Sequence, residues 1–590
     1  MMDYEYAIAM MDHEYAIRGY EKIFIDDDGI VFNEEKTTLI EYSIVKTEST
    51  YSIPPGVTYI EDSAFYSCYK LKIITLPKSV TSIGASAFEY CYNLRNIFAH
   101  EDNPVFADVD GVLFSKDHSV LVRYPEGRND QAYSIPDGVT SVGANAFSWC
   151  NLTGITLPEG VTSIGKGAFR GCRQLIGITL PESVTSIGDY VFSWCHKLAS
   201  ITLPEGVTSI GDGAFQGCSQ LASITLPESV TSIGASAFQG CSRLASITLP
   251  EGVTHIGRNA FSDCTQLASI PLPRGRSRLA SITLPEGVTS IGDDAFSWCH
   301  KLASITLPES VTSIGEHAFI GCTHLITIAI PQNVASIGIS AFWNCGNLRS
   351  IFVHEDNPVF ADVDGVLFSK DHSVLVKYPR GRNNQVYSIP NGVTSIGVNA
   401  FENCDKLKII IMPDGVTHIG KYAFRTCKNL IAITAPEYVT HIGEDSFLRH
   451  DRYAHAALPE SLVEIGDHAF RRCDQLISIT IPQYVTSIGE CVFLDCKSLK
   501  HIYVHEDNEV YSDVDGVLFS KDKATLIQTT RNSSMELNQA TKGLISKSYK
   551  LDKETTKLFS ETCNEMKTSQ AQELTKFMKR YIKKHHPDYK

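Results

Sequence analysis

Glycine and lysine in the segment Gly160–Gly167 resemble a loop that could cradle a phosphate group. The spacing approaches G-x-x-x-x-G-K-[ST], with Lys166 at the lysine position. However, Gly167 occupies the place of the Ser or Thr hydroxyl that such a loop uses to hold Mg²⁺. In sister copies of the same segment, the Lys166 position is Asp212 or Ala235. We therefore expect a solvent position rather than a nucleotide site.

The acidic string "DVDG", which begins at Asp108, could supply carboxylates to Ca²⁺. An EF-hand loop needs glycine at position 6 and glutamate at position 12, whereas here Gly111 falls at position 4 and Ser119 at position 12. An irregular site that uses Asp108, Asp110 and Asp117 is one interpretation, and ordinary turn chemistry is the favoured one. We predict no catalytic residue, no cofactor and no metal.

Cysteine is the third reactive residue type, with 17 copies in the chain. Fifteen of them occupy one position of a repeated segment, and no C-x-x-C pair occurs, so neither zinc nor thioredoxin-like chemistry is indicated. We predict buried structural thiols rather than disulfides. The fifteen are Cys68, Cys91, Cys150, Cys172, Cys195, Cys218, Cys241, Cys264, Cys299, Cys322, Cys345, Cys404, Cys427, Cys473 and Cys496.

These residues belong to a segment that repeats mostly every 23 residues. In the copy at 198–220, Ile201 alternates with hydroxyl residues, which predicts a short strand that Pro204 ends. Val207–Ile210 predicts a second extended segment, and Ala214–Phe215 a helical or 3₁₀ turn that places the phenylalanine ring in the core. Because one coil cannot bury that ring alone, neighbouring coils must stack on it.

The pattern L-x-x-I-x-L-P-x-x-V-x-x-I-G-x-x-A-F-x-x-C resembles the BspA-like leucine-rich repeat family over roughly residues 25–529. The resemblance implies a β-rich (α/β-type) leucine-rich repeat solenoid, here of about sixteen 23-residue coils with a small helical C-terminal tail. It also implies a non-enzymatic role in adhesion to proteins or to host-cell material, and a place at the cell surface.

Two intervals between repeats contain extra sequence, "HEDNPVFADVDGVLFSKDHSVLV", from His100 and from His354. A third copy begins at His505, and a shorter relative begins at Asp26. The runs 111–114 and 119–124 predict a β-hairpin that projects from the stack or covers its edge. We therefore predict a cap at 1–50, a solenoid at 51–500 with hairpins at about 98–135 and 352–389, a terminal hairpin cap at 501–530 and a basic helical tail at 531–590.

One repeat is irregular, since Pro273 and Pro285 are separated by only 12 residues. Either the stack is kinked at this point or Arg274–Arg278 forms a small basic loop. The sequence leaves both interpretations open.

The charge distribution divides the chain into two regions. Its net charge of −15 argues against nucleic acid as a partner, because phosphate backbones require clustered Lys and Arg. The segment 531–590 is about +6, with 13 Lys or Arg against 7 Asp or Glu. Leu574, Phe577, Met578 and Tyr581 are spaced for a helix from about 570 to 584, which either caps the last coil or binds a partner or a membrane surface.

The start of the chain lacks the pattern of a conventional signal peptide, and no run of residues is apolar enough to span a membrane. These patterns indicate a cytoplasmic or non-classically exported protein, whereas a cell-surface location is implied only by the family resemblance. The alternative function is an intracellular or host-directed effector whose basic C-terminal helix selects the partner.

Paired hydroxyl residues on the predicted strands form the candidate binding surface. Aligned coils would place them in rows on the concave sheet expected of such a solenoid, where a protein ligand could bind. The candidate residues are Ser200, Thr202, Ser223, Thr225, Ser246, Thr248, Ser281, Thr283, Ser304 and Thr306.

Overall fold

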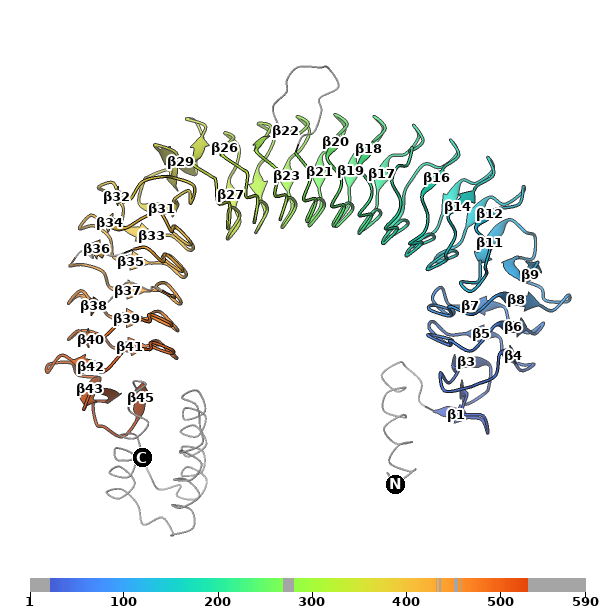
Figure 1. The fold of residues 1–590 in the computed structure, drawn as a ribbon, viewed down its shortest axis with the longest axis horizontal. Coiled ribbons are helices and arrows are strands. Elements are labelled where there is room, and N and C mark those ends of the chain that lie inside the picture. Colours follow the sequence, from blue (N-terminus) through green and yellow to red (C-terminus); the bar gives the residue numbers. More distant parts are fainter. Residues whose placement is uncertain are drawn as a thin grey trace, which may run out of the picture. The chain divides into compact units, whose positions relative to one another are not determined.

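The computed structural model describes residues 22–268, 281–430, 432–434, 437–449, 455–456 and 458–528. The chain divides into two compact units. Unit 1 contains residues up to 324 together with 336–342, and unit 2 contains 325–335 and the residues from 343 onward. Both units are built from stacked coils of β-structure, and no helix occurs in the described ranges (Figure 1).

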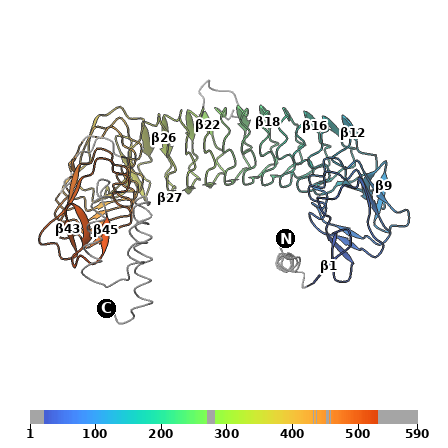
Figure 2. The ribbon, with the colours of Figure 1, turned by 60° about the horizontal axis from the view of Figure 1, so that its bottom comes forward.

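Most coils contribute a short strand to a first row, in which neighbouring strands pair in parallel, and the coil around Thr202 takes part through single bridges. In unit 1 the strands of this row are β4 (Thr50–Ser52), β6 (Ile73–Leu76), β8 (Asn96–Ala99), β12 (Ala132–Ser134), β14 (Gly154–Thr156), β16 (Gly177–Thr179), β18 (Ser223–Thr225), β20 (Ser246–Thr248), β22 (Ser281–Thr283) and β24 (Ser304–Thr306). In Figure 2, β12, β16, β18 and β22 run along one edge of this unit. In unit 2 they are β26 (Thr327–Ile330), β28 (Ser350–Val353), β32 (Val386–Ser388), β34 (Ile409–Ile411), β36 (Ala432–Thr434), β38 (His455–Ala456), β40 (Ser478–Ile481) and β42 (His501–Val504).

A second row consists of two-residue strands, which confirms the second extended segment predicted at Val207–Ile210. In unit 1 they are β5 (Tyr59–Ile60), β7 (Ser82–Ile83), β13 (Ser141–Val142), β15 (Ser163–Ile164), β17 (Ser209–Ile210), β19 (Ser232–Ile233), β21 (His255–Ile256), β23 (Ser290–Ile291), β25 (Ser313–Ile314) and β27 (Ser336–Ile337). In unit 2 they are β33 (Ser395–Ile396), β35 (His418–Ile419), β37 (His441–Ile442), β39 (Glu464–Ile465) and β41 (Ser487–Ile488).

Four three-stranded antiparallel segments interrupt the coils. They are β1 (Ile23–Ile25), β2 (Val31–Asn33) and β3 (Thr38–Glu41); β9 (Phe106–Val109), β10 (Val112–Ser115) and β11 (Val120–Arg123); β29 (Phe360–Val363), β30 (Val366–Ser369) and β31 (Val374–Lys377); and β43 (Tyr511–Val514), β44 (Val517–Ser520) and β45 (Leu526–Gln528). The predicted hairpin between β10 and β11 is confirmed. We call these segments the hairpin modules.

Each of the first three hairpin modules begins a new second row. The last module strand pairs in parallel with the first two-residue strand that follows, as β11 pairs with β13 and β31 with β33. A module tyrosine also starts the next aromatic stack, since Tyr124 packs on Phe147 with ring centroids 5.3 Å apart and Tyr378 packs on Phe401 at 5.2 Å. The modules are therefore integral starting turns of the stack rather than projections from it.

Buried asparagines attach three modules to the coil before them. The amide of Asn103 donates to the carbonyl oxygens of Pro77 (2.9 Å) and Val80 (2.8 Å) and accepts from the backbone N–H groups of Val105 (2.9 Å) and Phe106 (2.8 Å). The same four bonds recur around Asn357 and Asn508. All the hydrogen-bonding capacity of this side chain is used, so it fixes the module in place.

Stacked phenylalanine rings form the centre of the core. In the described residues sixteen coils each contribute one buried ring, and within each run between hairpin modules neighbouring rings lie 5.2–5.8 Å apart with planes within 24° of parallel. Phe215 is held by a turn in which the Cys218 N–H bonds to the Phe215 carbonyl at 3.1 Å. The turn does not continue as the helical or 3₁₀ segment that the sequence predicts, because Gly213 and Gly217 on either side have φ values of 58° and 73°.

The irregular repeat does not interrupt this core. Phe261 stacks on Phe296, 35 residues later, at 5.5 Å, and β21 pairs with β23 as other neighbours do. The 12 additional residues therefore form an insertion within one coil, which favours the loop interpretation over a kinked stack. Residues 269–280, which contain the basic sequence, lie outside the described residues, as do 529–590 with the predicted tail helix.

The fifteen repeated cysteines are all buried and none is in a disulfide. Each thiol faces the core, and the Sγ of Cys172, for example, donates to the Phe147 carbonyl at 3.1 Å. Burial raises the pKa of the Cys172 thiol to about 12. Since the thiolate is the reactive form, these cysteines are inert in the folded chain. The prediction of structural thiols is confirmed.

This burial predicts the outcome of thiol labelling. In a Cys563→Ser variant, which removes a cysteine outside the described residues, we expect at most one thiol per native chain to react with a maleimide. That thiol is Cys491, the half-buried cysteine outside the repeated position. All remaining cysteines should react in guanidinium, and mass spectrometry counts the adducts. Labelling of several repeated cysteines without denaturant would contradict the buried ladder.

Candidate functional site

The hydroxyl residues proposed as a binding surface lie on the first row. Ser223 pairs with Ser246 and Thr225 with Thr248, and Ile224 between them is buried while the hydroxyl residues are exposed or half-buried. Alternation along the strand thus places the hydroxyl groups outward. Thr202 joins this set through a single bridge to Thr225, while Ser200 is exposed one coil away.

A second group of candidate residues lies on β22 and β24, where Ser281 pairs with Ser304 and Thr283 with Thr306. In the described residues, the structure does not pair β20 with β22, because the insertion at 269–280 comes between them in the chain. The candidate hydroxyl residues therefore lie on two separate sets of paired strands and do not form one continuous array.

An exposed aromatic cluster lies at a different edge of unit 1, on the turns that follow the core phenylalanines. Tyr66 contacts Tyr90 edge-on at 5.2 Å, Tyr69 stacks with Tyr92 at 6.2 Å, and Tyr90 lies 5.0 Å from Trp149. Tyr69 and Tyr92 are each 48% exposed. We call these five residues the aromatic cluster.

Charged groups border the aromatic cluster. Glu89 accepts a hydrogen bond from the Trp149 indole N–H at 3.1 Å and faces Arg170 at 3.7 Å. The Arg173 guanidinium lies 5.1 Å from the Trp149 ring centroid and is exposed. Tyr, Trp and Arg are the residue types that dominate protein-binding hot spots. The cluster was not predicted from the sequence, because these positions vary from coil to coil; the strings "AFYSCYK", "AFEYCYN" and "AFSWC" nevertheless contain its aromatic residues.

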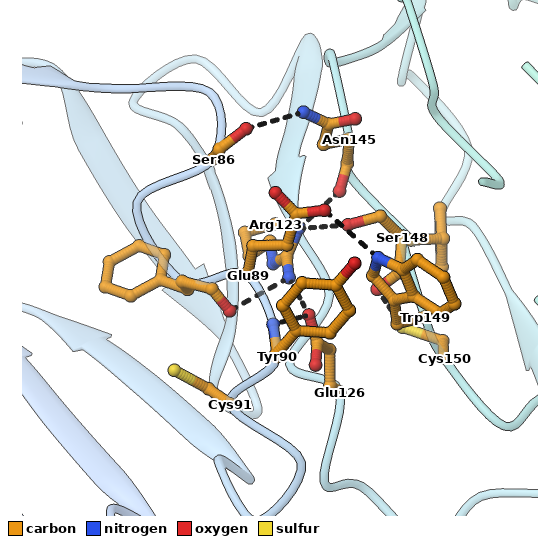
Figure 3. A network of polar contacts seen from close by, with 12 residues as sticks. Ser86, Glu89, Tyr90, Cys91, Arg123, Glu126, Asn145, Ser148, Trp149 and Cys150 are labelled. Carbon is orange, nitrogen blue, oxygen red and sulfur yellow. Dashed lines mark hydrogen bonds and ion pairs between the residues drawn. The ribbon is translucent and has the colours of Figure 1, made fainter. Parts of the chain in front are cut away.

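Buried ionic groups under this edge join the coils on either side of the β9–β11 hairpin module (Figure 3). Arg123 donates to the Asn145 carbonyl, to Ser148 Oγ at 2.8 Å and to the Phe88 carbonyl at 3.3 Å, and it pairs with Glu126. Burial raises the pKa of Glu126 to about 7, although the Arg123 charge opposes this shift. These bonds join residues before, within and after the module, so the network holds the module between its two neighbouring coils.

The β29–β31 module carries a different arrangement of charge at the same positions. Lys377 donates to the Asn399 carbonyl at 2.7 Å, and Arg380, which replaces Glu126, pairs with Asp405 at 3.0 Å. Glu402 stands where the coil after the β9–β11 module has Ser148, and burial raises the pKa of Glu402 against the charges of Lys377 and Arg425. The negative charge of Glu126 is thus replaced by a positive charge at Arg380, and the neutral Ser148 is replaced by the negative Glu402. Opposite charges remain paired at both junctions, as expected for buried ionic groups.

The carboxylates of Asp108 and Asp117, two of the three residues considered for Ca²⁺, accept hydrogen bonds from nearby backbone and hydroxyl groups. Asp108 accepts from the Ala99 N–H at 2.9 Å, and Asp117 accepts from the hydroxyl groups of Ser115 (2.6 Å) and Ser119 (2.8 Å). These bonds lower the pKa of Asp117 to about 2. Asp108 and Asp117 thus act in separate backbone turns, as the turn interpretation predicts.

Exposed tryptophans lie over glycines of the following coil. A methyl group placed on Gly217 would lie 2.8 Å from Cε3 of Trp194, whereas one on Gly240 would meet only Gly217 atoms at 3.7 Å or more. Both glycines have nearly the same positive φ, 73° and 71°. Gly217 therefore provides the space that the Trp194 ring occupies.

This pair predicts a matched comparison. Gly240→Ala should cost about 1 kcal/mol, because it introduces only the left-handed backbone strain. Gly217→Ala should cost about 1–3 kcal/mol more, because it also displaces the Trp194 ring. Chemical denaturation monitored by tryptophan fluorescence measures both. Equal destabilisation would show that Trp194 does not pack on Gly217.

Comparison with known proteins identifies the repeat. A family described as "BspA type leucine rich repeat region (6 copies)" matches residues 37–108, 129–223, 274–363 and 381–512, which is more than half of the chain. No curated protein matches.

Several solved structures are similar. A leucine-rich cell surface protein from Faecalibacterium prausnitzii is 29% identical, with 73% of this chain and 99% of that chain covered and a TM-score of 0.46. A leucine-rich repeat protein from Bacteroides ovatus is 29% identical, with coverage of 67% and 92% and a TM-score of 0.45. The leucine-rich repeat protein of T. pallidum is 27% identical, with coverage of 40% and 86% and a TM-score of 0.25.

Proposed function

The chain belongs to the BspA-type leucine-rich repeat family, and from this membership we propose that it is a non-enzymatic binding protein that holds a protein partner on its repeat surface. Stacked repeats present extended surfaces of the kind used in protein recognition. The proposed role is adhesion to proteins of a host cell or its matrix, with the protein at the cell surface. In the part of the chain that the structure describes, no helix is both long and apolar enough to cross a bilayer.

The aromatic cluster is the observation that carries this proposal. Tyr69 and Tyr92 stack with each other at 6.2 Å and are each 48% exposed, so the cluster offers aromatic surface to a partner. Tyrosine, tryptophan and arginine together are the residue types that dominate protein-binding hot spots, which supports a protein partner. The exposed Arg173 beside Trp149 adds a positive group for a partner carboxylate. The two sets of strands that carry the paired hydroxyl residues, at 200–248 and at 281–306, lie at a different edge and are a second proposed contact surface.

Binding to immobilised matrix proteins and to cultured cells tests the proposal. We expect the double variant Tyr69→Ser and Tyr92→Ser to lose binding, because it removes the exposed rings and leaves the buried core intact. A matched control is Tyr438→Ser and Tyr484→Ser, which removes two tyrosines exposed to 59% and 58% in unit 2. If both double variants lose binding equally, or if both bind as the native chain does, the aromatic cluster has no specific role in binding.

A second candidate function is an intracellular or host-directed scaffold whose C-terminal segment selects the partner. The charge difference between 531–590, about +6, and the acidic remainder of the chain favours this alternative. Fractionation of the native source separates the two functions, since adhesion requires protein at the cell exterior. Partner capture that depends only on residues 531–590 would favour the second.

A further inference from the structure

Three consecutive strands of unit 2 begin with a residue other than the serine that is usual in the second row. Most two-residue strands begin with serine, but β35, β37 and β39 begin with His418, His441 and Glu464. The strand register places His418 opposite His441 and His441 opposite Glu464. The two imidazole rings lie 4.5 Å apart between centroids and within 7° of parallel. This adjacency follows from backbone pairing and not from a chance orientation of the side chains.

Hydrogen bonds to threonine fix the tautomer of both histidines. Thr417 Oγ1 donates its proton to the Thr394 carbonyl at 3.2 Å and lies 2.8 Å from His418 Nδ1. When the hydroxyl proton goes to that carbonyl, as in the same contact of Thr231, where no histidine follows, Oγ1 accepts from Nδ1–H. The Nε2 atom of His418 then carries the free lone pair.

The same arrangement recurs one coil further on. Thr440 Oγ1 donates to the Thr417 carbonyl at 3.1 Å and lies 2.8 Å from His441 Nδ1. His441 therefore also presents a basic Nε2. An Nδ1–H bond to an oxygen is the second-shell contact that orients histidine ligands in metal sites.

Glu464 supplies a third donor beside this pair. Its Oε2 lies 3.7 Å from His441 Nε2, and the side chains of His441 and Glu464 are 42% and 50% exposed. Ser395 and Ser487 occupy the same position on the strands that pair with β35 and β39. The three side chains are therefore flanked by neutral residues along the row.

We propose that His418 and His441, with Glu464, bind one divalent transition-metal ion of the Cu²⁺ or Zn²⁺ class at the surface of unit 2. Imidazole nitrogen suits these ions, and Cu²⁺ should bind more tightly than Zn²⁺. As they stand in the described residues, these three side chains are not arranged to hold a metal ion, so the proposed site forms by side-chain rotation. With metal–nitrogen bonds of about 2.0–2.1 Å, two Nε2 atoms can be at most about 4.2 Å apart, so the rings must tilt toward each other. Their exposure permits this rotation.

Calorimetric titration of the untagged full-length protein with CuCl₂ and with ZnCl₂ tests the site. We expect one tight site per chain that weakens by at least about tenfold in His418→Ser and in His441→Ser. Serine is the residue of most other coils at this position, so both variants should fold. Glu464→Gln should have a smaller effect in the same direction.

His255→Ser is the matched control, because His255 begins β21 in unit 1 and its Nδ1 bonds Ser290 Oγ at 2.7 Å without a second histidine in register. This variant should bind as the native chain does. Electron paramagnetic resonance of the Cu²⁺ form should show two nitrogen ligands, reduced to one in either histidine variant. The proposal is overturned if no stoichiometric site is found, or if binding survives in the double histidine variant and is lost in His585→Ser and His586→Ser.

Discussion

Replacement of Asn357 by alanine is expected to destabilise unit 2 by about 4 kcal/mol. The fully buried amide donates to the Pro331 and Val334 carbonyls at 2.8 and 2.9 Å and accepts from the N–H groups of Val359 and Phe360 at 2.9 and 2.8 Å. Alanine removes all four bonds. Each buried polar group left without a partner costs about 1–3 kcal/mol, and partial rearrangement reduces the sum.

Two further variants separate this effect from simple loss of volume. Asn357→Asp keeps the shape, but its carboxylate cannot donate to two carbonyls, so we expect comparable destabilisation at neutral pH. Asp356→Ala changes the exposed neighbouring residue and should alter stability by less than about 0.5 kcal/mol. Hydrogen exchange at the Val359 and Phe360 amides reports on the local bonds. Unchanged protection in Asn357→Ala would contradict the proposed attachment of the hairpin module.

The second large effect is expected for Phe238→Ala, in the middle of the aromatic stack of unit 1. The ring is fully buried, with Phe215 at 5.4 Å on one side and Phe261 at 5.5 Å on the other. Truncation of a buried phenylalanine costs about 3–5 kcal/mol in unfolding free energy. In this variant the cavity lies between Phe215 and Phe261, and both rings lose their stacking contact with Phe238. Because coils interact only with neighbours, the loss should be local.

Limited proteolysis followed by mass spectrometry measures this local loss. We expect new cleavage sites in the coils that contain Phe215, Phe238 and Phe261, and unchanged resistance in unit 2. Phe238→Leu should show a smaller effect, since leucine fills part of the space. Cleavage spread evenly along the chain would indicate that the coils unfold together instead.

The sequence predicts the repeating parts of the fold well because each coil must satisfy the same constraints. Phe238 and Cys241 recur at fixed positions, and a ring or thiol that is buried in one coil is buried in the next. The hairpin at 111–124 was also predictable, since its strands and turn are local.

Features that depend on register between coils were not predictable to the same degree. The buried bonds of Asn103 join residues 23 and 26 positions apart, and nothing local marks them. The aromatic cluster could not be predicted, because the sequence does not show that Tyr90 contacts Trp149 across an intervening hairpin module. The helical turn predicted at Ala214–Phe215 was wrong, because the left-handed backbone at Gly213 and Gly217 overrides a short helical preference.

The hairpin modules also bear on how the length of this protein can change. The strings from His100 and His354 are nearly identical, and the two modules share the asparagine bonds to the coil before them and the parallel strand pairing to the coil after them. A genetic crossover between their two coding regions would excise residues 100–353 and still leave one module with these bonds and this pairing. Strains of the source organism should therefore differ in size by whole blocks of coils.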